Sequence, residues 1–334
     1  DKKMREKYGI PFYRDKSGEL KEVEFAILGM GKLGGLELNY SSDIDILYIY
    51  TSNIGEMIPT ESNSNPINIS IHEYFTKLAI SIKKIIDEIT SEGNVFRVDL
   101  DLRPEGKSGE IVNSLEGCEI YYESWGRLWE RQALMKARVS AGSESLGEKF
   151  FTMLEPFIYR KSIDFTAVKE ITGMKEKINQ NINKKNRNNI NIKLGKGGIR
   201  EVEFAVQTYQ LIYGGREKEI RGANTLEALK ALHRLKFIKK IEYKKLREAY
   251  IFLRDLENRV QISFGLQTHI LPEDKFLLAV LSRKMNIVGG SIEELNEKLN
   301  NKFIGHTKFV SDIFSDLFKK EQEGKVGEHK SKID

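Results

Sequence analysis

The sequence predicts an α+β protein in two parts, a mixed α/β amino-terminal domain followed by an all-helical one. Its 334 residues suffice for about two domains of roughly 150 residues each. Short apolar strands and glycine-rich turns precede residue 115, whereas long stretches with apolar residues at helical spacing follow it. We therefore expect one domain over residues 1–142, a helical domain over 143–320, and a polar tail or linker over 321–334.

The composition excludes several classes of protein. Lys and Arg number 54 against 49 Asp and Glu, and the net charge of +5 is too small for a dedicated nucleic-acid or membrane-surface binder. The single cysteine, Cys118, excludes a disulfide scaffold and a multi-cysteine zinc site, and we expect it to be buried. The sequence lacks an apolar stretch of about 18 residues, and its charged start is unlike a signal peptide. We expect a cytoplasmic protein, and the start without a methionine suggests a piece of a longer chain.

Three stretches of the first domain are typical of strands. Residues 23–28 form a short apolar run followed by glycines, and residues 44–50 are mostly β-branched and aromatic. Residues 95–102 alternate, with Arg97, Asp99 and Asp101 on one face and apolar residues on the other. The polar residues 53–68 predict a loop.

Apolar residues at helical spacing predict helices over the remainder of the chain. The first covers residues 71–89, and the second covers residues 115–139 with Trp125 and Trp129 in the core. On the second helix, Arg127, Arg131 and Arg138 are expected to share one face. Further helices are expected over residues 167–182, 199–213, 225–235, 241–266 and 291–319, with an Asn- and Lys-rich linker over residues 179–191.

The segment from Gly29 to Asp45 carries the most specific chemical pattern. A glycine-rich turn follows the first predicted strand, and backbone N–H groups in such turns can approach phosphate oxygens. The residues of the pattern are Gly29, Gly31, Lys32, Gly34, Gly35, Ser42, Asp43 and Asp45. Because Asp43 and Asp45 are two residues apart on a predicted strand, their side chains point to the same side.

Two carboxylates on one side of a strand repel each other unless a cation lies between them. Hard oxygen ligands of this kind suit Mg²⁺, which commonly also binds substrate phosphates. A third acidic strand residue, Asp99 or Asp101, would complete a two-metal site for phosphoryl or nucleotidyl transfer. The alternative interpretation is a solvated acidic strand face. A Rossmann dinucleotide motif and a P-loop are both excluded, because the expected βαβ unit does not follow the glycine turn and no Gly-Lys-Ser/Thr follows it at the required spacing.

Four separated motifs resemble the glutamine synthetase adenylyltransferase family, within the polymerase-β-like nucleotidyltransferase superfamily. They are Gly-Met-Gly-Lys-Leu-Gly-Gly-x-Glu-Leu-Asn with Ser-Ser-Asp-Ile-Asp over 29–45, Arg-Val-Asp-Leu-Asp-Leu-Arg-Pro over 97–104, Trp-Glu-Arg-Gln-Ala-Leu-Met-Lys-Ala-Arg over 129–138, and Gly-Gly-Ile-Arg-Glu-Val-Glu-Phe over 197–204. The resemblance covers about residues 25–271. It implies a polymerase-β-like nucleotidyltransferase domain packed against an all-helical bundle domain.

The resemblance also implies roles for individual residues. Members of the family carry two related halves, one that adds AMP to a tyrosine of glutamine synthetase and one that removes it with inorganic phosphate, releasing ADP. The motif over 197–204 is similar to the removing half. Asp43, Asp45 and Asp99 would hold two Mg²⁺ ions, with Mn²⁺ as an alternative. Nucleotide and phosphate binding would fall to the glycine turn, Ser42, Arg103, Arg131, Lys136, Arg138, Lys193, Arg200, Glu201 and Glu203.

Three details of the motifs leave assignments open. The spacing to Asp43 that the superfamily resemblance implies fits Gly31-Lys32 as the phosphate-contacting pair, so that Gly34-Gly35 would serve helix packing. Asp101 adds a further carboxylate to the strand, although Asp99 occupies the position that matches the family. Arg200 and Glu203, three residues apart on a predicted helix, either close over the nucleotide or form an ion pair.

Three functions remain open from the sequence. The first is phosphorolytic removal of AMP, the second is ATP-dependent addition of AMP, and the third is a catalytically silent docking module for glutamine synthetase or a PII-type signal protein. The expected partners are adenylylated glutamine synthetase, inorganic phosphate and ADP, and a PII-type signal protein acting through the full-length enzyme. Neither nucleic acid nor a membrane is expected to bind.

Overall fold

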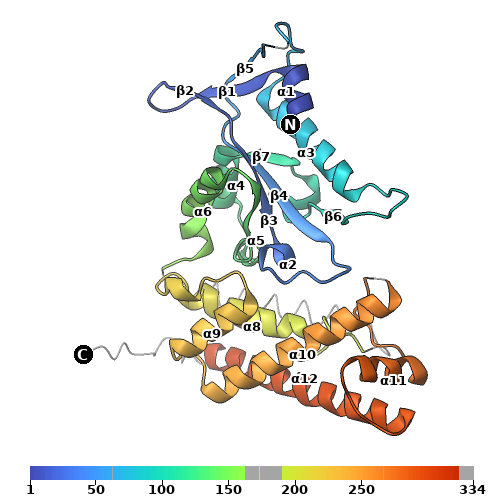
Figure 1. Cartoon of the computed structure of the whole chain (residues 1–334). Helices are drawn as coiled ribbons and strands as arrows, with labels where there is room; N and C mark the ends of the chain where they lie inside the picture. Colours follow the sequence, from blue (N-terminus) through green and yellow to red (C-terminus); the bar gives the residue numbers. More distant parts are fainter. Residues whose placement is uncertain (62, 162–172, 174–189, 266, 323–334) are drawn as a thin grey trace. The chain divides into compact units, whose positions relative to one another are not determined.

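The computed structural model describes residues 1–61, 63–161, 173, 190–265 and 267–322 (Figure 1). Nearly all of the helix expected over 167–182, most of the linker expected over 179–191 and most of the tail after 320 lie outside these residues. The chain forms two compact units. The first comprises Asp1–Leu38 and Ser42–Tyr159, and the second comprises Asn39–Ser41 and Arg160–Asp334.

The first unit is built on a mixed sheet in the order β6-β4-β3-β8, with β7 also paired to β4. β3 (Phe25–Gly29) and β8 (Arg138–Gly142) are antiparallel neighbours, as are β3 and β4 (Ile44–Tyr50). β6 (Val98–Asp99) and β7 (Val112–Ser114) both run parallel to β4. The expected strand over residues 44–50 is therefore confirmed, and it lies at the centre of the sheet.

Alternate residues of β4 face opposite sides of the sheet. Ile44, Ile46, Tyr48 and Tyr50 belong to one buried cluster with residues of helix α3 (Ile71–Asp87). Within that cluster the Phe75 ring stacks on Tyr50 with the ring centroids 4.9 Å apart. By alternation Asp45 points to the opposite face of the sheet, at the start of a strand that is otherwise buried.

The remaining elements of the first unit surround this sheet. α6 (Glu144–Ile158) packs against β3, β8 and α4 (Leu115–Ser124). A second, antiparallel sheet has the order β2-β1-β5. Its strands and the preceding helix are β1 (Ile10–Arg14), β2 (Leu20–Glu22), β5 (Glu56–Ile58) and α1 (Lys2–Tyr8). β5 lies inside the segment that was expected to be a loop.

The strand expected over residues 95–102 is wrong in length, because only Val98 and Asp99 pair with β4. The chain turns directly afterwards. The backbone N–H of Asp101 donates to the Asp99 side chain at 2.7 Å, and the N–H of Arg103 donates to the Leu100 carbonyl at 3.2 Å. This local turn chemistry replaces strand pairing despite the alternating sequence.

The single helix expected over residues 115–139 is also wrong. α4 ends at Ser124, α5 spans Leu128–Leu134, and Arg138 already belongs to strand β8. The break falls at Gly126, where a Cβ atom would lie 2.5 Å from both the Phe157 ring and the Tyr122 carbonyl oxygen. Trp125 is consequently 73% exposed rather than a core residue.

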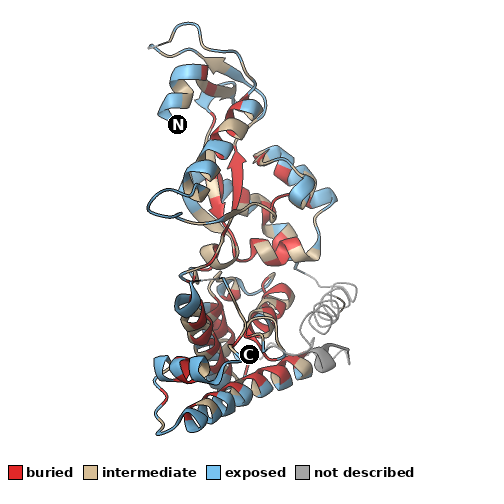
Figure 2. Ribbon diagram, turned by 90° about the vertical axis from the view of Figure 1, so that its right-hand side faces the viewer, coloured by how far each residue is buried: buried red, intermediate tan, exposed pale blue. Residues whose placement is uncertain are grey.

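The second unit is helical, as expected. Its helices are α8 (Ile199–Tyr213), α9 (Thr225–Arg234), α10 (Lys240–Phe264), α11 (Lys275–Lys284) and α12 (Ile292–Gln322). α12 packs on α8, α10 and α11, and residues of all five helices share one buried core. Figure 2 shows these buried residues along the inner sides of the helices. α12 continues two residues into the expected polar tail, and α11 was not expected from the sequence.

Helix α6 belongs to the first unit, because it packs on β3, β8, α4 and α5. That division falls after Tyr159 and so differs from the boundary expected after Gly142. The cause lies in the sheet. β8 is an edge strand, and the helix that follows it covers the apolar residues of the same sheet.

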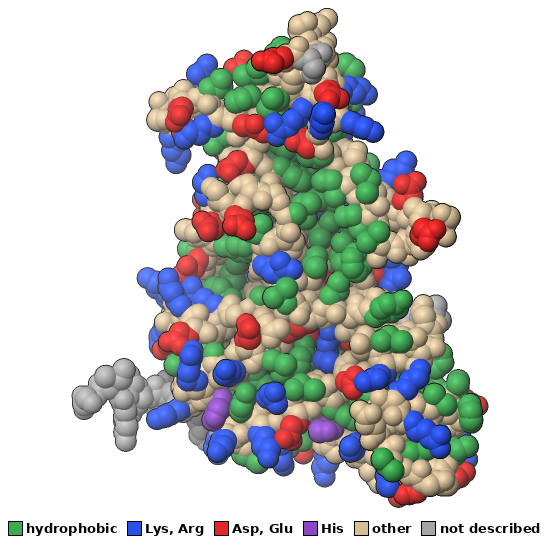
Figure 3. Space-filling model, in the orientation of Figure 1, with side chains coloured by type: hydrophobic (Ala, Val, Ile, Leu, Met, Phe, Trp, Pro, Cys, Tyr) green, Lys and Arg blue, Asp and Glu red, His purple; other side chains and the backbone are tan. Residues whose placement is uncertain are grey.

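Surface and burial agree with the composition. On the face drawn in Figure 3, Lys and Arg side chains are interspersed with Asp and Glu rather than gathered into one basic field. Cys118 is buried as expected, and burial raises the pKa of its thiol to about 12. None of the described helices combines the length and apolar character that crossing a bilayer requires.

Two glycines of the second unit should respond in opposite ways to alanine. Gly197 has φ +72°, and a Cβ there would lie 1.8 Å from the Thr307 carbonyl oxygen of α12. We expect Gly197→Ala to lower the free energy of unfolding by about 2 kcal/mol or more through overpacking. Gly305, inside α12, has open space around its Cβ position, so Gly305→Ala should raise stability by roughly 0.5–1 kcal/mol. Urea denaturation of both variants checks this pair, and effects of the same sign would contradict the described packing.

Candidate functional site

The predicted glycine turn lies directly against Asp45. It connects β3 to α2 (Gly31–Gly34), a single helical turn. Gly31 has φ +51°, and a Cβ atom on it would lie 2.6 Å from the Asp45 carboxylate. The Met30 N–H donates to the Asp45 carbonyl oxygen at 2.8 Å. Only a residue without a side chain fits this left-handed position beside the carboxylate.

The other glycines of the motif have packing roles. A Cβ on Gly34 would lie 1.7 Å from the Lys136 carbonyl oxygen, and one on Gly29 would lie 2.4 Å from the Ser140 hydroxyl. Gly35 is buried and closes the turn, its N–H donating to the Gly31 carbonyl at 3.0 Å. These contacts agree with the expectation that Gly34-Gly35 serves packing. Lys32 is half-buried on α2.

The predicted carboxylates are brought together by strand register. Asp45 and Asp99 are directly paired across the parallel strands β4 and β6, so both side chains leave the sheet on the same face. Asp43 precedes β4 with the same parity as Asp45, and the buried Ser42 precedes Asp43. Asp99 accepts the N–H of Asp101 in a tight turn.

Arg97 and Lys83 belong to the same region, although the sequence did not single them out as functional. The Arg97 guanidinium forms an ion pair with Asp43. An open pocket of about 450 Å³ is lined by Asp43, Lys83, Arg97, Val98, Asp99, Leu100, Asp101, Arg103 and Ile111. The alternation over 95–102 placed Arg97 on the face of Asp99, but its contact with Asp43 depends on the strand pairing.

The donor chemistry of this region fits a divalent cation. Carboxylate oxygens are preferred by Mg²⁺, and Asp45 and Asp99 leave paired strands on one face. As the side chains stand, no three His, Cys, Asp or Glu residues of the described chain form a group with metal-binding geometry. Asp43 is instead paired with Arg97, and Asp99 is turned toward its own loop. The assignment of Asp43, Asp45 and Asp99 as metal ligands stays a prediction.

Two of the predicted phosphate-binding arginines are buried and hold the fold. The Arg103 guanidinium donates to the carbonyls of Leu100, Lys107 and Gly109 at 2.9–3.0 Å and so closes the loop after β6. Arg131 is 3% exposed and donates twice to the Ile158 carbonyl, which fastens α5 to the end of α6. Buried guanidinium groups require such acceptors.

Lys136 and Arg138 are likewise engaged within the first unit. Lys136 forms an ion pair with Glu37 at 2.6 Å, and both side chains are at most 10% exposed. Arg138 donates to the Leu33 carbonyl at 3.3 Å. The expected common helix face for Arg127, Arg131 and Arg138 is wrong, because Arg127 caps α5, Arg131 lies inside it and Arg138 lies on β8. A direct phosphate contact by these cations stays a prediction.

In the second unit, the turn before α8 is closed by its own hydrogen bonds. The N–H groups of Lys193 and Leu194 donate to the Asn191 side chain, and those of Gly198 and Arg200 donate to carbonyls of the same turn. Gly197 packs on α12 at Thr307. The N–H groups of the turn are therefore used within the turn itself, and anion binding by Lys193 and Arg200 stays a prediction.

The acidic residues of this motif lie on α8. Arg200 is exposed, whereas Glu201 and Glu203 are half-buried. Glu203 accepts a hydrogen bond from the Tyr250 hydroxyl at 3.1 Å, which connects α8 to α10. This contact gives Glu203 a packing partner that the sequence did not suggest.

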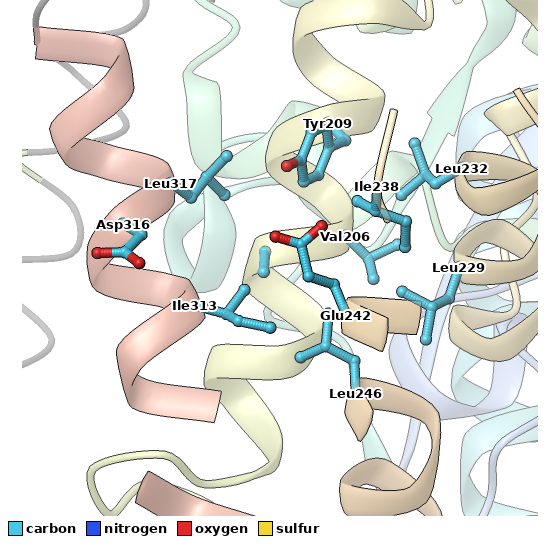
Figure 4. A pocket seen from close by; sticks show the side chains of 11 residues that line it. Val206, Tyr209, Leu229, Leu232, Ile238, Glu242, Leu246, Ile313, Asp316 and Leu317 are labelled. Carbon is cyan, nitrogen blue, oxygen red and sulfur yellow. The ribbon is translucent and has the colours of Figure 1, made fainter. Parts of the chain in front are cut away.

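A small apolar cavity of about 40 Å³ lies among α8, α9, α10 and α12 (Figure 4). Its polar groups come from Tyr209, Glu242 and Asp316, and Glu242 accepts the N–H of Lys239 at the start of α10. The cavity is far smaller than the several hundred Å³ of typical ligand pockets, and none of the predicted site residues lines it. It is not a nucleotide site.

The sequence of the chain matches known protein families. Residues 2–153 match the family model for glutamate-ammonia ligase adenylyltransferase, and residues 172–318 match the model for GlnD PII-uridylyltransferase. The chain is 43% identical over 270 residues to a bifunctional glutamine synthetase adenylyltransferase/adenylyl-removing enzyme of Mannheimia haemolytica, covering 80% of this chain and 27% of that protein. A protein of the same name from Pseudomonas aeruginosa is 41% identical over 271 residues, 81% of this chain and 27% of its own length.

The fold is of the α+β class, and its matches are to nucleotidyl-transferring enzymes. The chain belongs to the glutamine synthetase adenylyltransferase/adenylyl-removing enzyme family. It spans about a quarter of the length of the relatives that it matches.

The contact between Gly31 and Asp45 can be measured by a double-mutant cycle. Gly31→Ala should destabilise the protein by about 2 kcal/mol or more, from backbone strain and from displacement of the carboxylate. Asp45→Ala removes the carboxylate, so Gly31→Ala should be milder in that background by about 1 kcal/mol. Gly18→Ala, at φ +83° with open space around it, is the matched control for backbone strain alone. Chemical denaturation gives the free energy of unfolding of each variant. Additive effects of Gly31→Ala and Asp45→Ala would contradict the contact.

Proposed function

We propose that this chain removes AMP from adenylylated glutamine synthetase by phosphorolysis. The observation that carries the proposal is the pairing of Asp45 with Asp99 beside the Gly31 turn, where Asp99 also lines an open pocket together with Asp43. Paired carboxylates next to a close backbone turn are suited to hold a cation against a phosphate group. The names of the relatives support glutamine synthetase as the substrate.

In the proposed site, Asp43, Asp45 and Asp99 hold two Mg²⁺ ions, or Mn²⁺ in their place. When bound, such ions neutralise charge on the phosphoryl oxygens and on the leaving oxygen. The Asp43 carboxylate must then leave Arg97. The Arg97 side chain is 48% exposed and therefore has room to turn toward the anionic substrate. Lys83, which lines the same pocket, adds positive charge near this substrate.

The reaction exchanges one phosphorus–oxygen bond for another. An oxygen of inorganic phosphate attacks the phosphorus of the AMP group, the bond to the tyrosyl oxygen breaks, ADP forms, and the tyrosyl oxygen takes up a proton. Free phosphate is strongly hydrated, so its binding needs fixed cations. Lys193 and Arg200, held by the rigid turn before α8, are the proposed phosphate ligands, with Glu201 orienting the start of that helix.

The direction of the reaction is proposed from the sequence Gly-Gly-Ile-Arg-Glu-Val-Glu-Phe over 197–204, which resembles the removing half of the family. The alternative is ATP-dependent adenylylation, which the bifunctional name of the relatives keeps open. A PII-type signal protein is the proposed regulator, acting through the full-length enzyme, and the match of residues 172–318 to a PII-uridylyltransferase model supports it. A catalytically silent docking module is the third possibility, and the presence of both Asp43 and Asp45 weighs against it.

Neutralising the paired carboxylates should abolish activity without unfolding the protein. We expect Asp43→Asn and Asp45→Asn to lower the rate of ADP release by several orders of magnitude, because the proposed metal ligands are lost. Stability should change by less than about 1 kcal/mol, since Asn has nearly the size of Asp and the ion pair of Asp43 with Arg97 is partly exposed. Asp101→Asn should be milder than Asp99→Asn. ADP release and circular dichroism are measured on each variant, and an active Asp45→Asn protein would refute the ligand assignment.

The direction of transfer can be tested with the same substrate. We expect ADP release to require phosphate, with little free AMP and no transfer from ATP to unmodified glutamine synthetase. Arg200→Ala should raise the phosphate concentration needed for half-maximal rate about tenfold or more, by loss of a charge-assisted contact. Lys230→Ala, which removes an exposed cation of α9, is the control and should change nothing. Efficient adenylylation from ATP, or AMP release without phosphate, would contradict the assignment.

A further inference from the structure

Helix α10 carries two polar residues in an otherwise apolar buried stripe. Leu253, Leu256 and Val260 face the core of the second unit, yet Glu257 and Gln261 on the same helix are also 0% exposed. A buried carboxylate is strongly destabilising unless charged or hydrogen-bonding groups compensate it. The groups that contact Glu257 therefore matter to the structure.

The Asn39 amide is one of these groups, and both of its ends are engaged. Its Nδ2 donates to Glu257 Oε2 at 2.6 Å and to Gln261 Oε1 at 3.3 Å. Its Oδ1 accepts from Arg254 Nη2 at 2.7 Å. Asn39 is 8% exposed and belongs, with Tyr40 and Ser41, to the second unit. This position needs one side chain that donates to Glu257 and accepts from Arg254, and the carboxamide of asparagine carries both a donor and an acceptor.

Arg254 and His269 also contact Glu257. Arg254 Nη1 donates to Glu257 Oε2 at 2.8 Å, and His269 Nδ1 lies 2.8 Å from Glu257 Oε1. The Arg254 side chain is 13% exposed, so this pair is largely withdrawn from water. Arg254 therefore contacts both Asn39 and the carboxylate that Asn39 contacts.

The neighbouring residue is held much less. Tyr40 is 76% exposed, and its backbone N–H reaches the Asn258 side chain only at 3.4 Å. The Asn39 amide therefore holds the segment 39–41 on α10, whereas the exposed Tyr40 ring contributes no burial. Asp43, the first proposed metal ligand, follows Asn39 by four residues in the chain.

We propose that Asn39, Arg254, Glu257 and Gln261 form a clamp, and that Asn39 is a positioning residue for catalysis. The clamp fixes the backbone of residues 39–41, and this segment leads directly into Ser42 and Asp43. Because the segment is short, a change of its path would displace the Asp43 carboxylate. The clamp itself rests on the contacts of α10, whereas its effect on catalysis rests on the proposed function.

An amide–carboxylate exchange tests the clamp without reference to activity. In Asn39→Asp the donor facing Glu257 Oε2 at 2.6 Å becomes a second carboxylate oxygen, so the clamp should open. We expect amide hydrogen exchange over residues 40–42 to accelerate about tenfold or more, measured by mass spectrometry on the whole chain. In the double variant Asn39→Asp/Glu257→Gln a donor again lies between the two residues, but Arg254 Nη1 then faces that donor, so exchange should become slower than in Asn39→Asp without returning fully to the wild-type rate.

A matched pair on the same helix tests the arginine. Arg254→Lys keeps the charge but loses the second donor group that reaches Asn39, so it should also accelerate exchange over 40–42. Arg259 pairs with Asp255 at an exposed position of α10, and Arg259→Lys should leave exchange unchanged. If Asn39→Asp fails to fold by circular dichroism, the comparison of Arg254→Lys with Arg259→Lys decides the question.

The catalytic part is read from kcat and KM for phosphate-dependent ADP release. A misplaced Asp43 should lower kcat on the order of 100-fold in Asn39→Asp, with a much smaller change in the phosphate KM. A kcat higher in the double variant than in Asn39→Asp, with both proteins folded at the assay temperature, separates positioning from general destabilisation.

The outcomes are distinct. Folded Asn39→Asp and Arg254→Lys proteins with wild-type exchange would overturn the clamp. Accelerated exchange with wild-type kcat would overturn the positioning role. A wild-type chain that shows no phosphorolysis, while exchange responds to the variants as expected, would overturn the proposed function and the catalytic role of Asn39 but leave the clamp.

Discussion

The first unit depends on the close approach of Gly31 to the carboxylate of Asp45. β4 is buried on both faces along most of its length, so a carboxylate is tolerated only at its start. Gly31 lies so close to that carboxylate that a Cβ atom on it would be only 2.6 Å from a carboxylate oxygen. The strand register pairs Asp45 with Asp99, and Asp99 in turn lines the open pocket together with Asp43.

The cations of the first unit divide into two groups with different surroundings. Arg103, Arg131 and Lys136 are buried and satisfied by carbonyl or carboxylate oxygens of the fold. Arg97 and Lys83 line the open pocket and are partly exposed. Burial forces a cation to be saturated by protein acceptors, whereas a partly exposed cation can exchange its partner. The residue type alone does not distinguish the two groups.

Residue type and local pattern also explain which expected helices and strands are confirmed and which are wrong. The strand over residues 44–50 and helices near 71–87, 199–213 and 225–234 follow from strong local periodicity, and the structure confirms them. The helix over 115–139 failed because Gly126 must fit under Phe157, and the strand over 95–102 failed because the Asp99 side chain accepts the N–H of Asp101. In both places a few specific contacts overrode a regular pattern of apolar residues.

By itself the sequence determined the α+β class, the carboxylates of the glycine-turn motif and the resemblance that the comparisons confirm. These features are local, or are motifs that can be read along the chain. Only the tertiary structure decided that Asp45 is paired with Asp99, that Arg97 contacts Asp43, and that Asn39 inserts its amide beside the buried Glu257. Those contacts join residues 54 to 218 positions apart, and such partners are set by strand register and helix packing, which periodicity along the chain does not specify.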